Sequence, residues 1–102
     1  MSVVSIDLEA AEEFVAAADW YNDERPGLGD EFLADAQAAA SALPRRLVHR
    51  VLDDYRHLGV HLAPLSGWPY RLIYVVNASS HHVIALAHER REPGYWSHRL
   101  RR

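Results

Sequence analysis

The chain has 102 residues, of which 49% are hydrophobic and 25% are charged; its formal net charge is −3, and it contains no cysteine. These proportions exclude a disordered or fibrous chain, and the length fits one domain spanning residues 1–102. The lack of cysteine excludes a disulfide framework, a thiolate nucleophile and a cysteine-ligated zinc site. No apolar run reaches the roughly 20 residues of a membrane helix and no signal-peptide pattern is present, so we expect a cytoplasmic protein.

The charges are divided between the two halves of the chain. Residues 1–44 hold ten carboxylates and one arginine, a net charge of −9, whereas residues 45–102 hold ten arginines and four carboxylates, a net charge of +6. All eleven basic residues are arginine. Cationic chemistry in this chain must therefore use the planar guanidinium rather than a titratable amine. Codon bias in a GC-rich genome would explain the missing lysine equally well.

The N-terminal half has the pattern of a strand followed by two helices. We expect a strand over residues 2–6, then a helix that Asp7 caps and that runs to about Asn22. Its apolar stripe leaves Glu9, Glu12, Glu13 and Asp19 toward solvent or a partner, and consists of Leu8, Ala11, Phe14, Val15, Ala18 and Tyr21.

Residues 25–29 read RPGLG, which predicts a compact turn. A second, alanine-rich helix follows and ends before Pro44. Because the turn is so short, we expect the two helices to pack as an antiparallel pair.

The C-terminal half is typical of strands. Residues 45–58 fit either a third short helix or an extended connection, and residues 60–63 alternate as a strand. Residues 70–76 and 83–87 are two apolar runs around a polar linker, and this pattern predicts an antiparallel hairpin.

The register of that hairpin determines which polar side chains meet. If the hairpin is symmetric about Ser79 and Ser80, His88 lies opposite Arg71, and the preceding strand places His61 near Ile73. We therefore expect Arg71, His88 and His61 on one face of the sheet. Just beyond the strand end come Arg90, Arg91 and Tyr95.

Such a cluster suits phosphodiester chemistry. Arginine forks bind phosphate oxygens and stabilise developing charge, and histidine exchanges a proton near neutral pH. Tyr95 and Trp96 offer surfaces on which an unstacked base can lie. The structural alternative is that Arg71 pairs with a carboxylate such as Glu89, His88 is an ordinary strand-end residue, and the two aromatic rings cover the core. We expect no metal site and no cofactor.

Several short motifs occur together between about Val3 and Arg99: WY followed by PGLG and EF, then PYRLIY, then HERREPGYW. In this order and spacing they resemble the RelE/ParE toxins of bacterial type II toxin–antitoxin systems. The resemblance implies an α+β fold, in which an N-terminal strand and an antiparallel helical hairpin pack on a twisted, mainly antiparallel sheet of three to four strands. It also implies growth arrest, plasmid stabilisation and a cognate antitoxin that wraps the toxin in a hetero-oligomer.

The resemblance leaves the target open. ParE-like members poison DNA gyrase without known catalysis of their own, and we favour this target or an undetermined one. RelE-like members cleave mRNA on the ribosome; there Arg71 matches the arginine at the scissile phosphate, and Tyr95 or His88 matches the proton-transfer residue. The RelE pattern also has lysines that this chain lacks. A third reading is an inactive homologue that still binds antitoxin. Residues expected to bind the target or nucleic acid are His61, Arg90, Arg91, Trp96 and Arg99.

Overall fold

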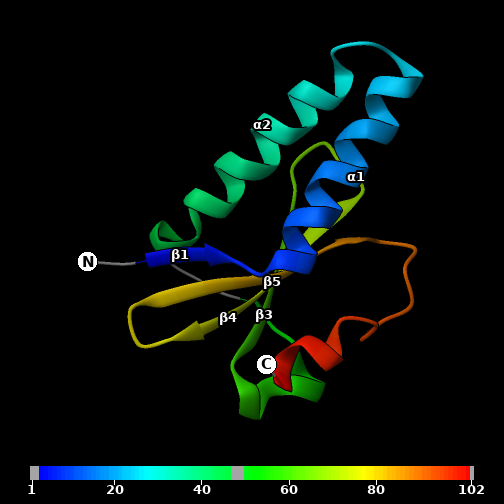
Figure 1. The fold of residues 1–102 in the computed structure, drawn as a ribbon. Helices are drawn as coiled ribbons and strands as arrows, with labels where there is room; N and C mark the ends of the chain where they lie inside the picture. The colour runs from blue at the N-terminus through cyan, green and yellow to red at the C-terminus, as the bar shows by residue number, and fades with distance from the viewer. Residues whose placement is uncertain (1–2, 47–49, 102) are drawn as a thin grey trace.

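The computed structural model describes residues 3–46 and 50–101 (Figure 1). The elements in chain order are β1 (Val3–Ile6), α1 (Leu8–Glu24), α2 (Leu28–Ser41), the 3₁₀ turn η1 (Leu43–Arg45), β2 (Arg50–Val51), η2 (Asp53–Leu58), β3 (Val60–Pro64), β4 (Tyr70–Asn77), β5 (Ser80–His88) and η3 (Ser97–Arg101). Ser2, at the start of the expected first strand, and residues 47–49, within the stretch expected to be a third helix or an extended connection, lie outside the described residues.

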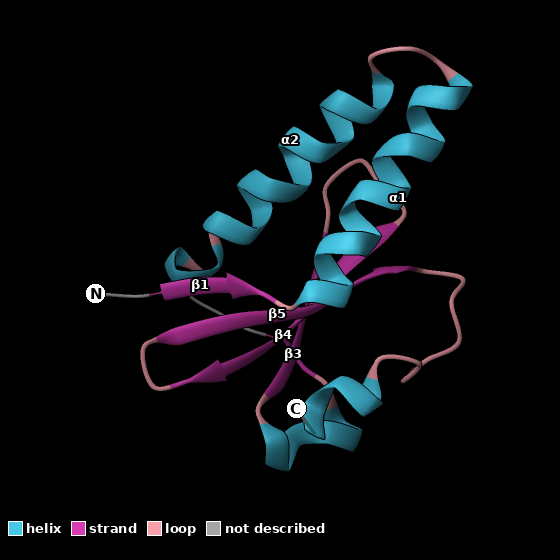
Figure 2. Cartoon of the chain, viewed as in Figure 1, coloured by secondary structure: helices cyan, strands magenta, loops and turns pink. Residues whose placement is uncertain are grey.

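The strands form one sheet in the order β1-β5-β4-β3-β2. β1 runs parallel to β5, and the other neighbouring pairs are antiparallel. The α1–α2 hairpin covers one face of the sheet, and η2 and η3 lie together on the other side (Figure 2). The expected α+β architecture is confirmed. The sheet has five strands rather than the expected three to four. The additional strand is the short β2, which forms within residues 45–58, where the sequence fitted either a helix or an extended connection.

Helix α1 begins at the predicted cap, where the Asp7 carboxylate accepts a hydrogen bond from the Glu9 N–H at 2.9 Å. The predicted apolar stripe is rotated in the structure. Leu8 is 73% exposed and Val15 is 55% exposed, whereas the buried residues of α1 are Ala10, Phe14, Ala17 and Ala18. The small alanines let α1 approach both α2 and β5, and the rotation turns Glu9 and Glu13 toward the sheet.

Helix α2 starts without a capping side chain of its own, because its N-cap is Gly27 in the left-handed conformation. The end of α1 supplies the cap instead: the Asn22 side-chain oxygen accepts from the N–H groups of Gly27 at 3.1 Å and Gly29 at 2.8 Å. Gly29 is buried so close to α1 that a Cβ there would lie 1.9 Å from the Ala18 carbonyl oxygen. The turn predicted for residues 25–29 therefore also fixes the distance between the helices.

The β4–β5 hairpin turns at Ala78 and Ser79, and Ala78 has a φ of +51°. A bulge follows: Ile73 pairs with Ala85, but Tyr74 pairs with Val83. Ile84 is the extra residue, and both Ile84 and Ala85 contribute to the core on the same side of the sheet. The bulge shifts the register of every residue pair between it and the open end of the hairpin.

Two apolar clusters lie on the two faces of the sheet. The cluster under the helices contains Phe14, Phe32, Leu72 and Leu86 together with their neighbours. The opposite cluster contains Leu62, Ile73 and Ala87, and Trp96 covers it together with the partly buried Tyr55. Among the described residues, no helix is long and apolar enough to cross a membrane.

The close approach at Gly29 gives a test of helix packing. Gly29→Ala should lower the free energy of unfolding by about 3 kcal/mol, because the added methyl group must push α1 and α2 apart. The matched control is Gly27→Ala, where no atom lies within 4 Å of the added Cβ. There the positive φ of +92° alone should cost about 1 kcal/mol. Urea unfolding of both variants measures the difference; equal losses would contradict the packing described for Gly29.

Candidate functional site

A cleft of about 380 Å³ opens on the face of the sheet that the helices leave free. Its floor is formed by β3, β4 and β5, and its walls are formed by η2 and by the loop 89–96 that follows β5. Aromatic side chains and charges of both signs line it. The lining residues that matter for its chemistry are Asp53, Asp54, Tyr55, Arg71, His88, Arg91, Glu92, Tyr95 and Trp96.

Arg71 lies on β4 between Pro64 of β3 and Ala87 of β5. Because side chains alternate along a strand, Arg71 shares the cleft face with Ile73. Its side chain is partly exposed, and its Nη2 donates to the main-chain oxygen of Glu89 at 3.2 Å. The guanidinium therefore holds the start of the 89–96 loop and still reaches the cleft.

His88 does not lie opposite Arg71, so the predicted register is wrong. The bulge and the turn at Ala78 pair His88 with Tyr70, and the two rings meet edge to face with centroids 5.0 Å apart. The Nδ1 atom of His88 accepts from the Arg90 N–H at 3.0 Å. The His88 ring therefore packs on the Tyr70 ring toward the helix-covered side, although His88 also lines the cleft, whereas the Arg71 side chain lies on the cleft side.

His61 is also on the helix-covered side. It pairs with Tyr74 rather than lying beside Ile73, and its ring stacks on Tyr74 with centroids 5.6 Å apart. The Nδ1 of His61 donates to the Gly59 carbonyl oxygen at 2.7 Å. The expected gathering of Arg71, His88 and His61 on one face is thus contradicted by the strand pairing.

The residues after the strand end divide into exposed and buried ones. Arg90 and Arg91 are exposed, and the Arg91 guanidinium lies 3.9 Å from the centroid of the Tyr95 ring, a cation–π contact. Trp96 is 4% exposed and packs against Tyr55, with ring centroids 4.9 Å apart. Trp96 is therefore part of the core under the cleft and does not offer a free stacking surface in this structure.

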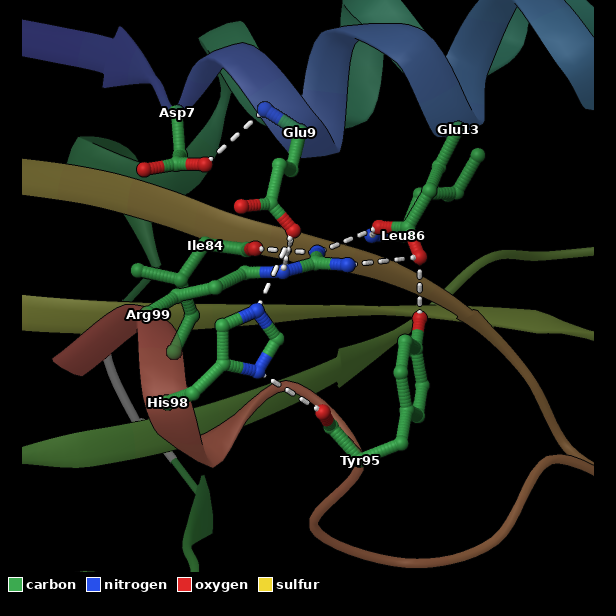
Figure 3. Close-up of polar contacts among 8 residues, drawn as sticks. All are labelled: Asp7, Glu9, Glu13, Ile84, Leu86, Tyr95, His98 and Arg99. Atoms are coloured by element: carbon green, nitrogen blue, oxygen red, sulfur yellow. Dashed lines mark hydrogen bonds and ion pairs between the residues drawn. The ribbon is translucent and has the colours of Figure 1, made fainter.

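Tyr95 presents its ring to the cleft and its hydroxyl to α1. The hydroxyl donates to Oε2 of Glu13 at 2.5 Å (Figure 3). Burial raises the pKa of the Tyr95 phenol, and the hydrogen bond and negative charge of Glu13 raise it further. The phenol therefore stays protonated and is engaged away from Arg71.

Arg99 was expected to bind a target, but it is only 8% exposed and lies between α1 and the sheet. Its Nη1 donates to Glu13 at 2.7 Å and to the Ile84 carbonyl oxygen at 2.8 Å, and its Nε donates to Glu9 at 3.1 Å. Burial lowers the pKa of this guanidinium, but the hydrogen bond and charge of Glu13, together with the charges of Tyr95 and Glu9, raise it by more, so the net pKa is above its usual value. Arg99 thus joins the acidic half of the chain to the basic half.

The sequence pattern missed the part that Glu9 and Glu13 play in this network. Glu13 accepts four hydrogen bonds, from the Leu86 N–H, from the Tyr95 hydroxyl and from two nitrogens of Arg99. Glu9 accepts from Arg99 and also pairs with His98, whose Nε2 is 3.2 Å from its carboxylate. The only sequence signal for this network was the opposite charge of the two halves, which does not identify partners.

The comparisons with known proteins support the fold and extend no further. No protein-family model matches the sequence, and no curated protein sequence matches it. Among solved structures, the chain is similar to one in the structure titled "Chromosomal ParDE TA system from P. aeruginosa", with a TM-score of 0.73 and 17% sequence identity. The similarity covers 86% of this chain and 96% of that chain. The α+β fold implied by the resemblance to RelE/ParE toxins is thereby confirmed.

The raised pKa of Tyr95 predicts how stability depends on alkaline pH. The unfolded chain releases the Tyr95 proton near the ordinary pKa of 10.0, whereas the folded chain keeps it. The stabilisation is therefore fully present below that pH and is lost as the pH rises above it. Between about pH 8 and about pH 11, wild type should lose more unfolding free energy than Tyr95→Phe, as measured by denaturant unfolding. Parallel losses in the two proteins would contradict the buried phenol.

Proposed function

We propose that this chain is the toxin of a type II toxin–antitoxin pair, held inactive by a cognate antitoxin. The similarity of its fold to a chain of the ParDE toxin–antitoxin structure, over nearly the whole of both chains, supports this proposal. The motifs that resemble RelE/ParE toxins support it independently of that comparison. The cleft beside Arg71 is the surface that we assign to the toxic action.

We further propose that this surface docks on a protein target such as DNA gyrase rather than cutting mRNA. The observation that carries this choice is that both residues expected to transfer a proton already have partners. His88 lines the cleft, but its ring packs on Tyr70 and its Nδ1 accepts from the Arg90 N–H, and the Tyr95 hydroxyl donates to Glu13. Cleavage of a phosphodiester needs an available proton-transfer group within hydrogen-bonding reach of the reacting oxygen.

One feature favours the endonuclease as the second candidate. Arg71 and Arg91 both line the cleft, and two guanidinium groups suit phosphate oxygens. Asp53, Asp54 and Glu92 line the same cleft, however, and their carboxylates would repel a nucleic-acid backbone. Mixed charges of this kind suit a protein surface better, since complementary patches of both signs fix its orientation.

The antitoxin is expected to seek the arginine-rich half of the chain. Of the arginines there, Arg45, Arg46, Arg50, Arg56, Arg90 and Arg91 are exposed. An antitoxin with an acidic, extended or amphipathic tail would complement them, and a complex in which only residues 1–44 are contacted would refute this expectation. The partner is best sought in a short reading frame beside the gene for this chain.

The proposal predicts that expression of the chain alone arrests bacterial growth and that co-expression of the antitoxin restores it. For a gyrase-type target, a DNA-damage reporter should respond while mRNA stays intact. Cleaved mRNA within minutes of induction would instead establish the endonuclease. Normal growth with folded protein in the cell would leave only the inactive, antitoxin-binding homologue.

The same assay tests the cleft. Arg91→Ala should raise the inducer concentration needed for arrest by about tenfold, because truncating a charged interface residue commonly costs that much affinity. Arg71→Ala should also weaken arrest, and under the endonuclease reading it should abolish it. The matched control is Arg25→Ala, which removes the same charge at the tip of the helical hairpin, where Arg25 pairs only loosely with Glu31 at 3.5 Å. Equal effects at Arg25 and Arg91 would exclude the cleft as the working surface.

A further inference from the structure

We propose that Glu13 is a positioning residue for the toxic surface: from α1 it holds Tyr95, and through the Tyr95 ring it fixes the guanidinium of Arg91 over the cleft. The inference rests on the proposed function for the meaning of the cleft. It concerns a residue of the acidic half of the chain that does not line the cleft itself. Figure 3 shows the contacts of Glu13 with Leu86, Tyr95 and Arg99.

Both oxygens of the Glu13 carboxylate are occupied. Oε1 accepts from the Leu86 N–H at 3.1 Å and from Arg99 at 2.7 Å, and Oε2 accepts from the Tyr95 hydroxyl at 2.5 Å and from Arg99 at 3.3 Å. The donors come from β5, from the 89–96 loop and from η3. One carboxylate thus sets the relative positions of three segments, and charge-assisted hydrogen bonds of this kind are the stronger ones.

The position of Glu13 is itself determined by the edge of the sheet. The parallel pairing of β1 with β5 ends at Ile6 and Val83, where the Asp7 N–H donates to the Val83 oxygen at 2.8 Å. Beyond that point no strand of residues 3–46 or 50–101 lies beside this edge of β5. The Glu13 carboxylate binds the Leu86 N–H and the Arg99 guanidinium binds the Ile84 oxygen, so side chains replace the missing strand.

The 89–96 loop has few attachments besides Tyr95. At its start, Arg71 and the Pro69 carbonyl oxygen hold the main chain of Glu89. At its end, Trp96 is buried against Tyr55. Glu92 and Pro93 between them are exposed. The Arg99 guanidinium lies 5.3 Å from the centroid of the Tyr95 ring, and the hydroxyl bond to Glu13 holds the outer end of the ring on which Arg91 stacks at 3.9 Å.

If Glu13 only stabilised the fold, its substitution would affect toxicity differently than if it positioned Tyr95 and Arg91. Glu9 offers the control, because it also accepts a hydrogen bond from Arg99, whereas the Tyr95 hydroxyl donates to Glu13. Glu9→Gln removes the same charge from α1, one turn away. If Glu13 only stabilised the fold through Arg99, both variants would weaken toxicity in proportion to the folded protein that they lose.

The experiment compares wild type with Glu13→Gln, Glu9→Gln, Tyr95→Phe and the Glu13→Gln/Tyr95→Phe double variant. Thermal unfolding reports the folded fraction at the growth temperature. Growth arrest is titrated with inducer. The Nε–Hε resonance of Arg91, assigned with Arg91→Lys, reports by its ring-current shift whether the guanidinium still stacks on residue 95.

We expect Glu13→Gln and Tyr95→Phe each to raise the inducer needed for arrest by about tenfold while the protein stays folded, a size usual for coupled side chains. The double variant should need no more inducer for arrest than Glu13→Gln alone, because both changes break the same hydrogen bond. The Arg91 resonance should move toward that of a solvated arginine in all three. Glu9→Gln should keep wild-type toxicity and the wild-type resonance.

The inference is overturned if the Arg91 resonance is unchanged in Glu13→Gln and Tyr95→Phe, or if Glu9→Gln weakens toxicity as much as Glu13→Gln. Should Glu13→Gln fail to fold, Tyr95→Phe still decides, because it removes a hydroxyl and leaves the Glu13–Arg99 pair. If wild type does not arrest growth, the proposed function fails, but the resonance of Arg91 still decides whether Glu13 positions it.

Discussion

The ion pair between Glu13 and Arg99 connects helix α1, in the acidic half of the chain, to the C-terminal segment, in the basic half. Arg99 is nearly buried, and an unpaired charge at that position would be strongly destabilising, so the guanidinium requires its carboxylate partners. Those partners, Glu13 and Glu9, lie on α1, 86 and 90 residues earlier in the chain. The C-terminal segment and the helical hairpin are therefore tied together, and the loop between β5 and η3 closes over one end of the sheet. The cleft exists because this tie holds the loop in place.

The separation of acidic and basic residues along the sequence provides the two sides of this ion-pair network. Most carboxylates of the acidic half are exposed on the helical hairpin, but Glu9 and Glu13 turn inward and meet the buried Arg99. Of the other arginines of the basic half, Arg71 and Arg91 line the cleft, together with Asp53, Asp54 and Glu92. The outer face of the helical hairpin is therefore acidic, whereas the cleft carries charges of both signs.

The sequence predicted features that depend on near neighbours. The Asp7 cap, the end of α2 before Pro44 and the antiparallel hairpin of β4 and β5 each follow from the preferences of a few adjacent residues. The site was predicted less well, because it depends on register. Nothing in the apolar run of residues 83–87 distinguishes the bulged Ile84 from its neighbours, and Ala78 is an unusual residue for a positive φ. The turn shifts the expected pairing by two residues and keeps each side chain on its face, whereas the one-residue bulge moves the His88 side chain to the face opposite Arg71. The Glu13–Arg99 pair joins residues too distant in sequence for any local pattern to connect.

The central claim is that the toxic surface is the cleft edge of Arg71, Arg91 and the residues that hold them. A selection for non-toxic point variants that still bind antitoxin tests it most directly, since antitoxin binding removes unfolded proteins from the set. Sequencing the survivors should find the changes concentrated at the cleft-lining residues and at Glu13 and Tyr95. Survivors concentrated instead on the exposed carboxylates and apolar side chains of α1 and α2 would contradict the account.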